Sequence, residues 1–450
     1  MPSAGSQHTY FSKLRIRNVR SFAEWQELDL TTGGRPAQWT LILGDNGLGK
    51  TTLLQCLASM RPVATVAKDA TGIEPDRVEP GLALRADDEL FSMARVGETE
   101  VELVAEFTSG NFSGPKRAVK TYSLEASIKV DDAGLVDLTC PSLEMESPLE
   151  PLVITYGAAR HQRYGTSVGR TSLPDAAESI YDASIELADP VEILEGLDYS
   201  AAKRQPGARD LLKRIKVALA QVIPGIARPT SIKLYGPAPP GSKTRKRGVQ
   251  VETVFGEVPF KSLSLGYQTM TAWMVDLSWR LYQHYPASPN PLREPAIVLI
   301  DELDLHLHPR WQRELRQTIV ETFPKIQFVA TAHSPVLAQT YLGMNLAIVR
   351  EENGRAVIES DPAVAKTWRL DEVITSALYE VDSAYSPEIA ADLKRRIDLR
   401  RKSRLTPSEK SELAALDSLA ESMAPKVDQY DENAMTLIRD AAALIGTRPR

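Results

Sequence analysis

The residues best suited to chemistry lie in LILGDNGLGKTTLLQCL, residues 41–57. An apolar run leads into the spacing G-x-x-x-x-G-K-T, with Gly44, Gly49, Lys50 and Thr51, and a helical pattern follows. In such a strand–loop–helix, backbone N–H groups and the N-terminus of the helix bind phosphates, the lysine reaches the β- and γ-phosphates, and the threonine hydroxyl binds Mg²⁺. The alternative, a glycine turn that opens an ordinary helix, is disfavoured by the Lys-Thr pair. The residues that we expect to contact a nucleotide here are Gly44, Asn46, Gly47, Gly49, Lys50, Thr51 and Thr52.

Two later strands end in polar residues that suit the same chemistry. AIVLIDELDLHLHP, residues 296–309, predicts a buried strand that ends in Asp301-Glu302. An aspartate there holds Mg²⁺, together with Thr51, and a glutamate polarises the attacking water. IQFVATAHSP predicts a strand that ends at His333, and ligands bind at this edge of an open α/β sheet. We therefore expect Glu302 and His333 to be catalytic, although a histidine that merely caps a strand end is the alternative.

The segment SLSLGYQ precedes a long helix predicted from Tyr267 to Tyr282. Ser264 and Gly266 at the start of a helix form an anion site without a lysine, and an ordinary N-cap is the alternative. His306 and His308 stand two residues apart, but neither a cysteine nor a third nearby histidine completes a zinc site. They are expected to belong to the loop that follows the acidic pair.

Composition limits the class of protein. A chain of 450 residues predicts two or three structural units, and a net charge of −6 confines any nucleic-acid contact to local patches. No apolar run approaches the roughly 20 residues that span a bilayer, and the N-terminus lacks the apolar core of a signal peptide. We therefore expect no membrane partner. Cys56 and Cys140 are the only cysteines, which favours a reducing, cytoplasmic location.

Periodicity organises the remainder of the chain. Alternating apolar residues predict strands at 101–107 and 122–130, and 208–223 forms an amphipathic helix. A hairpin with the basic tip KTRKR follows. After residue 350 the chain is expected to be mostly helical, with helices that begin at Ser386-Pro387-Glu388 and at the capping box of Thr406 and Glu409. Between them, DLKRRIDLRRKSR has seven basic residues in thirteen, which fits either a solvated helix face or a docking surface for a partner or DNA.

The ordered set GDNGLGKT, SLSLGYQ, IVLIDE, DLHLHP and TAHSP resembles the ABC-type ATPases of the RecF, SMC and OLD group. The resemblance implies an α/β fold: an ABC-type ATPase head at 10–350, with a mixed sheet flanked by helices, an antiparallel β lobe and an inserted region at about 61–262, plus a C-terminal helical extension at 360–450. It also implies a head-to-head dimer that sandwiches two ATP molecules with Mg²⁺. Lys50 of one copy and Ser264 of the other would grip one γ-phosphate. Glu302 would be the general base, His333 the switch histidine and Asp304 part of a loop that crosses the interface, with Gln162 and Arg160 as further candidates for the site.

The chain also has the segment YGA-x-R and an expected helical tail. With these features it resembles the compact ATPase subunits of Septu-type anti-phage defence systems. That resemblance implies an ATPase that senses infection and controls a separate nuclease effector subunit. The chain departs from SMC proteins because 61–262 lacks sustained heptads, and from OLD nucleases because its tail lacks a strand-end carboxylate cluster. Two alternatives stay open: a RecF-like repair ATPase acting on duplex or gapped DNA, and an ATP-locked scaffold with little turnover.

Overall fold

The computed structural model describes residues 8–67, 77–83, 93–110, 119–130, 136–139, 150–159, 176–185, 187–222, 226, 228–236, 248–253, 256–341, 344–360, 368–376, 379, 383–402 and 404–422. The chain forms two compact units, Met1–Tyr379 and Glu380–Arg450. Within the described residues, no helix combines the length and the apolar character needed to span a bilayer.

A six-stranded mixed sheet is the centre of the first unit. Its order is β11-β15-β16-β5-β17-β18, and all neighbours are parallel except β17 and β18. The strands are β5 (Trp39–Gly44), β11 (Val153–Tyr156), β15 (Ala296–Ile300), β16 (Ile326–Thr331), β17 (Asn345–Glu352) and β18 (Arg355–Ser360). Because β15, β16 and β5 are adjacent and parallel, their carboxyl ends meet at one edge.

A five-stranded antiparallel sheet forms the β lobe, in the order β10-β9-β8-β1-β2. Its strands are β1 (His8–Arg17), β2 (Gln26–Asp29), β8 (Glu100–Gly110), β9 (Val119–Val130) and β10 (Val136–Thr139). The predicted strands at 101–107 and 122–130 are therefore confirmed. Smaller sheets pair β3 (Thr31–Thr32) with β4 (Arg35–Pro36), β6 (Pro62–Ala67) with β7 (Arg77–Leu82), and β12 (Ile232–Tyr235) with β13 (Gly248–Thr253) and β14 (Gly256–Pro259).

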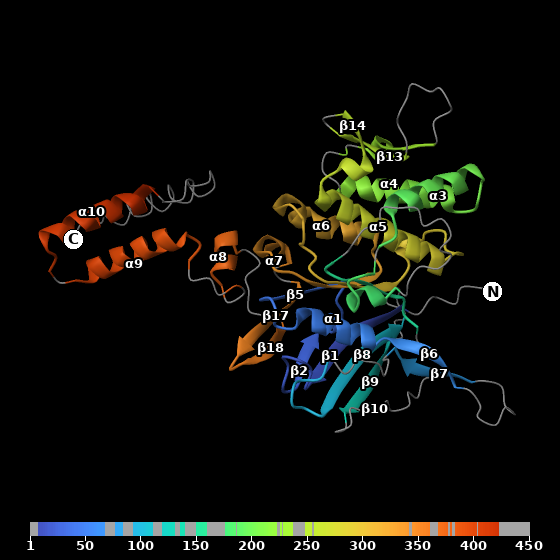
Figure 1. Ribbon diagram of the computed structural model, residues 1–450, viewed down its shortest axis with the longest axis horizontal. Coiled ribbons are helices and arrows are strands. Elements are labelled where there is room, and N and C mark those ends of the chain that lie inside the picture. Colours follow the sequence, from blue (N-terminus) through green and yellow to red (C-terminus); the bar gives the residue numbers. More distant parts are fainter. Residues whose placement is uncertain are drawn as a thin grey trace, which may run out of the picture. The chain divides into compact units, whose positions relative to one another are not determined.

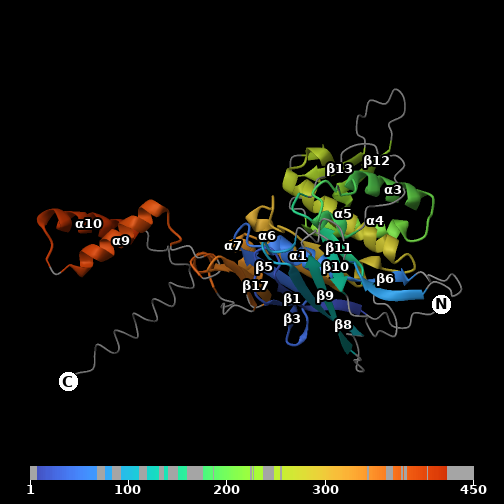
Figure 2. The same cartoon turned by 60° about the horizontal axis from the view of Figure 1, so that its bottom comes forward.

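Helices cover the mixed sheet on both faces. In Figure 1, α3, α4, α5 and α6 lie above α1, and β1, β8 and β9 lie below it. Figure 2, in which the antiparallel sheet comes forward, shows the same order. The helices of this unit in the described part are α1 (Lys50–Ser59), α3 (Pro190–Ala202), α4 (Ala208–Val222), α5 (Leu265–His284), α6 (Pro309–Thr322), α7 (Pro335–Tyr341) and α8 (Leu370–Ile374), with short 3₁₀ turns η1 (Glu178–Ile180), η2 (Pro229–Ser231), η3 (Phe260–Ser262) and η4 (Pro291–Arg293).

Two hydrophobic cores fill the spaces between these layers. Strand alternation sorts side chains between them: Val298 and Ile300 pack with α4, α5 and α6, whereas Ile297 and Leu299 pack with α1 and the antiparallel sheet. Helix α1 is buried on nearly all sides and not on one face alone. A helix held between two sheets gives the phosphate-binding loop a rigid base. The mixed sheet, flanking helices and antiparallel lobe are those of the expected α/β ATPase head.

One strand was missed at the end of the head. The tail after residue 350 was expected to be mostly helical, but β18 follows β17 through a tight turn at Asn353 and Gly354, which have φ values of 54° and 77°. Both residues tolerate positive φ, and Asn-Gly is a strong hairpin signal. The sheet therefore extends to Ser360.

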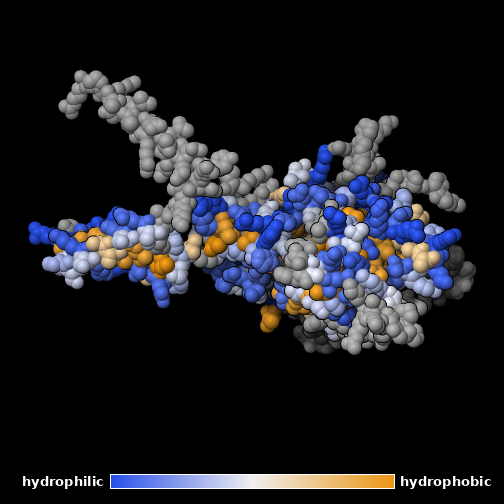
Figure 3. Space-filling view, turned by 90° about the horizontal axis from the view of Figure 1, so that it is seen from above, coloured by the Kyte–Doolittle hydropathy of each residue, from blue (hydrophilic) through white to orange (hydrophobic). Residues whose placement is uncertain are grey.

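The second unit contains a helical hairpin of α9 (Pro387–Arg401) and α10 (Pro407–Ser422). Ser386 is the N-cap residue of α9, and Thr406 and Glu409 bond reciprocally as a capping box, as predicted. Four residues of the basic run form ion pairs with α10: Arg395–Glu412, Arg396–Asp417, Arg400–Asp417 and Lys402–Glu409, at 2.5–2.8 Å. Much of this charge is thus neutralised within the hairpin. Figure 3 shows apolar side chains on the surface of the hairpin, and α10 has no buried residue in the part described.

Candidate nucleotide site

The loop after β5 depends on glycine at two positions. Gly44 has φ 145°, and a Cβ there would lie 2.3 Å from the Val349 carbonyl oxygen of neighbouring β17. Gly49 has φ 102°, and a Cβ there would lie 2.7 Å from both the Phe22 ring and the Ser21 hydroxyl. Since real Cβ atoms do not approach so closely, these glycines allow the loop to fold back tightly over the start of α1. This leaves the N-terminus of α1 available for phosphate.

The Lys50 side chain lies within the phosphate-binding loop. Its Nζ donates to the carbonyl oxygens of Gly44 and Asp45, at 2.8 Å each. Burial lowers the pKa of Lys50, while the carboxylates of Asp301 and Glu302 oppose that shift. Lys50 has no ion pair at salt-bridge distance among the described residues, so its ammonium group is poised to exchange the loop carbonyls for phosphate oxygens.

The acidic pair meets the loop as predicted. Thr51 Oγ1 donates to Asp301 Oδ2 at 2.8 Å, and Thr331 Oγ1 donates to Asp301 Oδ1 at 2.6 Å. Thr331 Oγ1 also accepts from the Glu302 backbone N–H at 2.8 Å. One buried hydroxyl at the end of β16 thus orients both members of the pair. Glu302 has φ 48°, a backbone conformation that is uncommon for a residue other than glycine.

His333 lies at the end of β16, where its backbone N–H donates to both Asp304 carboxylate oxygens, at 3.2 and 3.3 Å. Burial lowers the pKa of His333, and the nearby Lys50 ammonium lowers it further. The imidazole is therefore neutral at pH 7 and able to accept a hydrogen bond.

A cavity of about 310 Å³ gathers these groups. Its lining residues are Arg20, Ser21, Asn46, Gly47, Gly49, Lys50, Thr51, Thr52, Asp301, Glu302 and His333. Every predicted residue of the loop except Gly44 therefore lines one cavity, together with the predicted metal-binding and catalytic residues. Gly44 lies at its base, where its carbonyl binds Lys50.

Arg20 is a site residue that sequence reasoning missed. It follows β1 in a turn with φ 44°, and its Nη1 donates to Thr52 Oγ1 at 3.1 Å and to Gln55 Oε1 at 2.9 Å. Arg95 Nη1 holds this turn by donating to the Arg20 and Ser21 carbonyls. A guanidinium beside the phosphate-binding loop adds a second cation for a polyphosphate. The sequence signal was weak, since one arginine in a turn is common.

Ser264 and Gly266 lie apart from this cavity in the described part of the chain. Ser264 is the N-cap residue of α5, but its hydroxyl makes no capping bond there, and the adjacent Leu265 is 56% exposed. A Cβ on Gly266 would lie 2.3 Å from the His306 carbonyl oxygen, so α5 begins directly against the loop after the acidic pair. This segment presents an open helix N-terminus that does not serve its own chain's phosphate loop.

The two histidines after the acidic pair lie in a loop and at the start of a helix. His308 Nδ1 accepts from the Arg310 backbone N–H and caps α6, while His306, with φ 63°, lies exposed in the preceding loop. Among the described residues, no group of three His, Cys, Asp or Glu side chains is arranged to hold a metal. Gln162 and Arg160 lie outside the described residues, as do Cys140 and the basic tip KTRKR.

Comparison with known families now adds to this geometry. Residues 13–60 match a family described as "AAA domain", and residues 256–338 match one described as "AAA domain, putative AbiEii toxin, Type IV TA system". The first match contains the phosphate loop and α1, and the second contains Ser264, the acidic pair and His333. Both matched families are thus described as AAA domains.

Curated proteins similar to parts of this chain have retron and Septu names. The chain is 42% identical over 95 residues to "Retron Vc95 probable ATPase" of Vibrio cholerae serotype O1 biovar El Tor, which covers 21% of this chain and 18% of that protein. It is 33% identical over 120 residues to "Septu protein PtuA" of Bacillus mycoides (strain KBAB4), covering 26% and 16%. The matched segments thus span less than a fifth of either relative.

Solved structures give more distant matches. The SMC head domain from Thermotoga maritima is 12% identical with a TM-score of 0.39, over 78% of this chain and 98% of that one. The recombination mediator protein RecF with ATP is 13% identical with a TM-score of 0.38, over 79% and 100%.

Proposed function

We propose that the ATPase domain binds ATP with Mg²⁺ and hydrolyses it, and that this cycle controls a separate nuclease effector in anti-phage defence. The observation that carries the proposal is the single cavity in which Lys50, Thr51, Asp301, Glu302 and His333 meet. These groups come from three adjacent strand ends and supply a phosphate cation, metal-binding oxygens, a carboxylate base and a neutral imidazole.

The oxygen atoms in the cavity fit Mg²⁺. Thr51 Oγ1 and Asp301 Oδ2 lie 2.8 Å apart, and hard hydroxyl and carboxylate oxygens are the ligands that this ion prefers. When bound, Mg²⁺ would neutralise charge on the β- and γ-phosphates. Thr331 holds the other oxygen of Asp301, so the carboxylate faces the loop in a fixed orientation.

The side chains divide the remaining chemistry between them. Lys50 exchanges the carbonyls of Gly44 and Asp45 for phosphate oxygens, and Arg20 adds a second positive charge. Glu302 accepts a proton from the attacking water as the water's oxygen bonds to the γ-phosphorus, while the bond from this phosphorus to the β–γ bridging oxygen breaks and ADP leaves. Neutral His333 accepts a hydrogen bond from the same water and holds it in line.

A second copy of the chain would complete the site. Ser264 and the N-terminus of α5 form an anion-binding group that lies outside the cavity of their own chain. Closing two copies head to head would bring this group to the phosphate held by the other copy. The site would then hydrolyse ATP only as a dimer or within a larger homo-oligomer.

Control of an effector is supported by the Septu and retron names of the relatives. The helical hairpin also favours protein over DNA as its partner, because α10 carboxylates neutralise four of its basic residues.

Two measurements test the proposal. Phosphate release by wild type should be lowered about 10²- to 10⁴-fold in Glu302→Gln, which keeps the shape but not the base. Equal, negligible rates in both would favour the scaffold alternative. Separately, the chain should be purified with the products of its flanking genes and weighed with and without ATP. A second, nuclease-like chain in the particle supports effector control. An unaccompanied particle whose turnover is stimulated by duplex DNA would contradict effector control and favour the repair alternative.

A further inference from the structure

A second cavity, of about 390 Å³, lies in the helical part of the first unit, away from the nucleotide site. It is formed by α4, the η4 turn and the end of α6. Its lining residues are Asp210, Lys213, Arg214, Val217, Ala218, Asn290, Leu292, Arg293, Glu321 and Thr322. None of them belongs to the phosphate loop, the acidic pair or the segment at Ser264.

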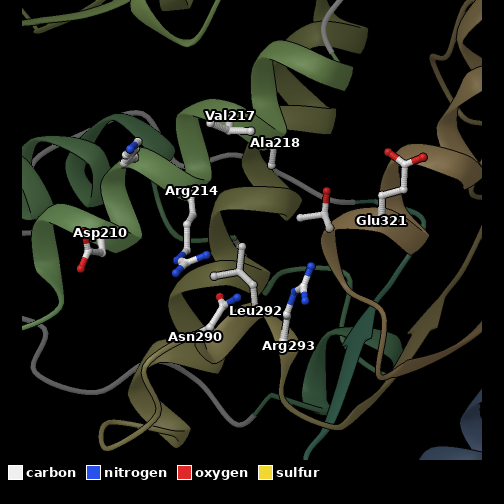
Figure 4. Close-up of a pocket in the computed structure, with 10 residues that line it drawn as sticks. Asp210, Arg214, Val217, Ala218, Asn290, Leu292, Arg293 and Glu321 are labelled. Carbon is white, nitrogen blue, oxygen red and sulfur yellow. The ribbon is translucent and has the colours of Figure 1, made fainter.

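Two arginines reach into this cavity without a partner. Figure 4 shows Arg214 extending from α4 toward Asn290, and Arg293 on the other side of Leu292. Among the described residues, neither guanidinium makes a hydrogen bond or an ion pair. Both arginines are exposed, as is Arg395 of the C-terminal hairpin, which by contrast is paired. Two unpaired guanidinium groups that line one cavity suit a carboxylate, which guanidinium binds through paired N–H···O bonds.

Asn290 indicates that the ligand also carries a hydrogen-bond donor. Its Oδ1 is buried and has no hydrogen-bond partner among the described residues. A buried acceptor without a donor costs free energy, so a ligand that brings an N–H or O–H group would relieve that cost. The preferred ligand therefore carries an anionic group and a hydrogen-bond donor close together.

Carboxylates at both ends of the cavity disfavour a nucleic acid as its ligand. Asp210 and Glu321 lie on opposite sides of the arginine pair in Figure 4, and both are exposed. A nucleic-acid backbone laid through the cavity would place phosphates against both carboxylates. A peptide with one acidic residue, flanked by neutral or basic residues, would place its carboxylate only against Arg214 and Arg293. Leu292, Ala218 and the 37% exposed Val217 supply apolar contact for the neighbouring side chains.

We propose that this cavity is a docking site for an acidic peptide segment of a partner protein, in which one Asp or Glu carboxylate lies between Arg214 and Arg293 and an adjacent backbone N–H donates to Asn290 Oδ1. The proposal is independent of ATP hydrolysis, since no group of the nucleotide site takes part in it.

The test uses the full chain and two synthetic peptides, acetyl-Lys-Ala-Glu-Leu-Ala-Lys-amide and the same peptide with Gln in place of Glu, each labelled with fluorescein. Binding is followed by fluorescence anisotropy. The Glu peptide should bind about fivefold more tightly than the Gln peptide, which is roughly the factor that a well-formed exposed ion pair supplies. The double variant Arg214→Gln/Arg293→Gln should lose this preference.

A matched control removes the same charge from the same region. Arg209→Gln/Arg313→Gln changes two exposed arginines of α4 and α6 that do not line the cavity, and it should keep the preference. Lys50→Ala should keep it too, which separates this site from the nucleotide site. Equal binding of the two peptides, equal loss in both double variants, or displacement by ATP or single-stranded DNA as strong as by unlabelled peptide would each overturn the proposal.

Discussion

Thr331 offers the sharpest test of how the catalytic pair is held. It is fully buried, and its hydroxyl donates to Asp301 Oδ1 at 2.6 Å while it accepts from the Glu302 N–H at 2.8 Å. Thr331→Val keeps the shape and removes both bonds. The lost bond to a charged carboxylate and the lost acceptor for a buried N–H together predict a decrease of about 2–4 kcal/mol in the free energy of unfolding. Because Asp301 and Glu302 lose their common anchor, we expect a 10- to 100-fold drop in turnover or in apparent Mg²⁺ affinity, the usual effect of removing such a support.

The assay is phosphate release at saturating ATP over a range of Mg²⁺ concentrations, at a temperature where every variant is folded. Thr331→Ser is the matched control, since it keeps the hydroxyl and loses one methyl group, worth about 0.8 kcal/mol. It should retain most of the turnover and the Mg²⁺ response. If the valine variant matched the serine variant in both stability and turnover, the hydroxyl would not be the anchor and the reasoning would be refuted.

Three further predictions concern other parts of the head. Lys50→Ala should abolish binding of a fluorescent ATP analogue while leaving thermal unfolding nearly unchanged, because within the described part of the chain Lys50 bonds only to loop carbonyls; tight binding would contradict the assignment. The lowered pKa of His333 predicts that turnover persists below pH 6.5, the ordinary histidine value, and falls only as the imidazole gains a proton. Since the unfolded chain protonates more readily, this histidine also makes folding less favourable as pH drops below about 6.5; His333→Gln should remove both effects, and an unchanged pH profile would argue against them. Asp276→Ala should destabilise the first unit by about 3 kcal/mol in urea unfolding followed by tryptophan fluorescence, because its buried carboxylate accepts from Arg280 and from Tyr156. A change below 0.5 kcal/mol would count against that role.

The closeness of the phosphate loop, the acidic pair and His333 could be predicted from the sequence because each part is local. The phosphate loop is one continuous segment, and Asp301 and His333 each end an apolar run, so parallel pairing of β15, β16 and β5 is enough to bring them together. Arg20 could not be found this way. Its place beside Thr52 depends on the turn after β1, which is fixed by Arg95 from a distant part of the chain.

Two other features of the structure, β18 and the ion pairs of α9, differ from what short-range sequence patterns predict. The strand β18 is carried by the Asn353-Gly354 turn, whose signal is two residues long. The sequence left open whether the basic run of α9 is a solvated helix face or a docking surface, because its neutralising acids lie on the next helix. Glu412 and Asp417 are spaced to face Arg395 and Arg396 only once the hairpin has closed. Ser264 differs in kind, since its proposed phosphate contact would be made to a second copy of the chain.

The most direct test of the central claim is the mass of Glu302→Gln in solution, measured by light scattering with and without ATP and Mg²⁺. This variant should bind ATP without turning it over, so a two-copy sandwich should accumulate. We predict that ATP shifts the variant from its resting mass to twice that mass or a higher multiple, and that adding Ser264→Arg prevents the shift while ATP binding is retained. A Glu302→Gln protein that stays monomeric at saturating ATP, or a shift that survives Ser264→Arg, would contradict a site completed by a second copy.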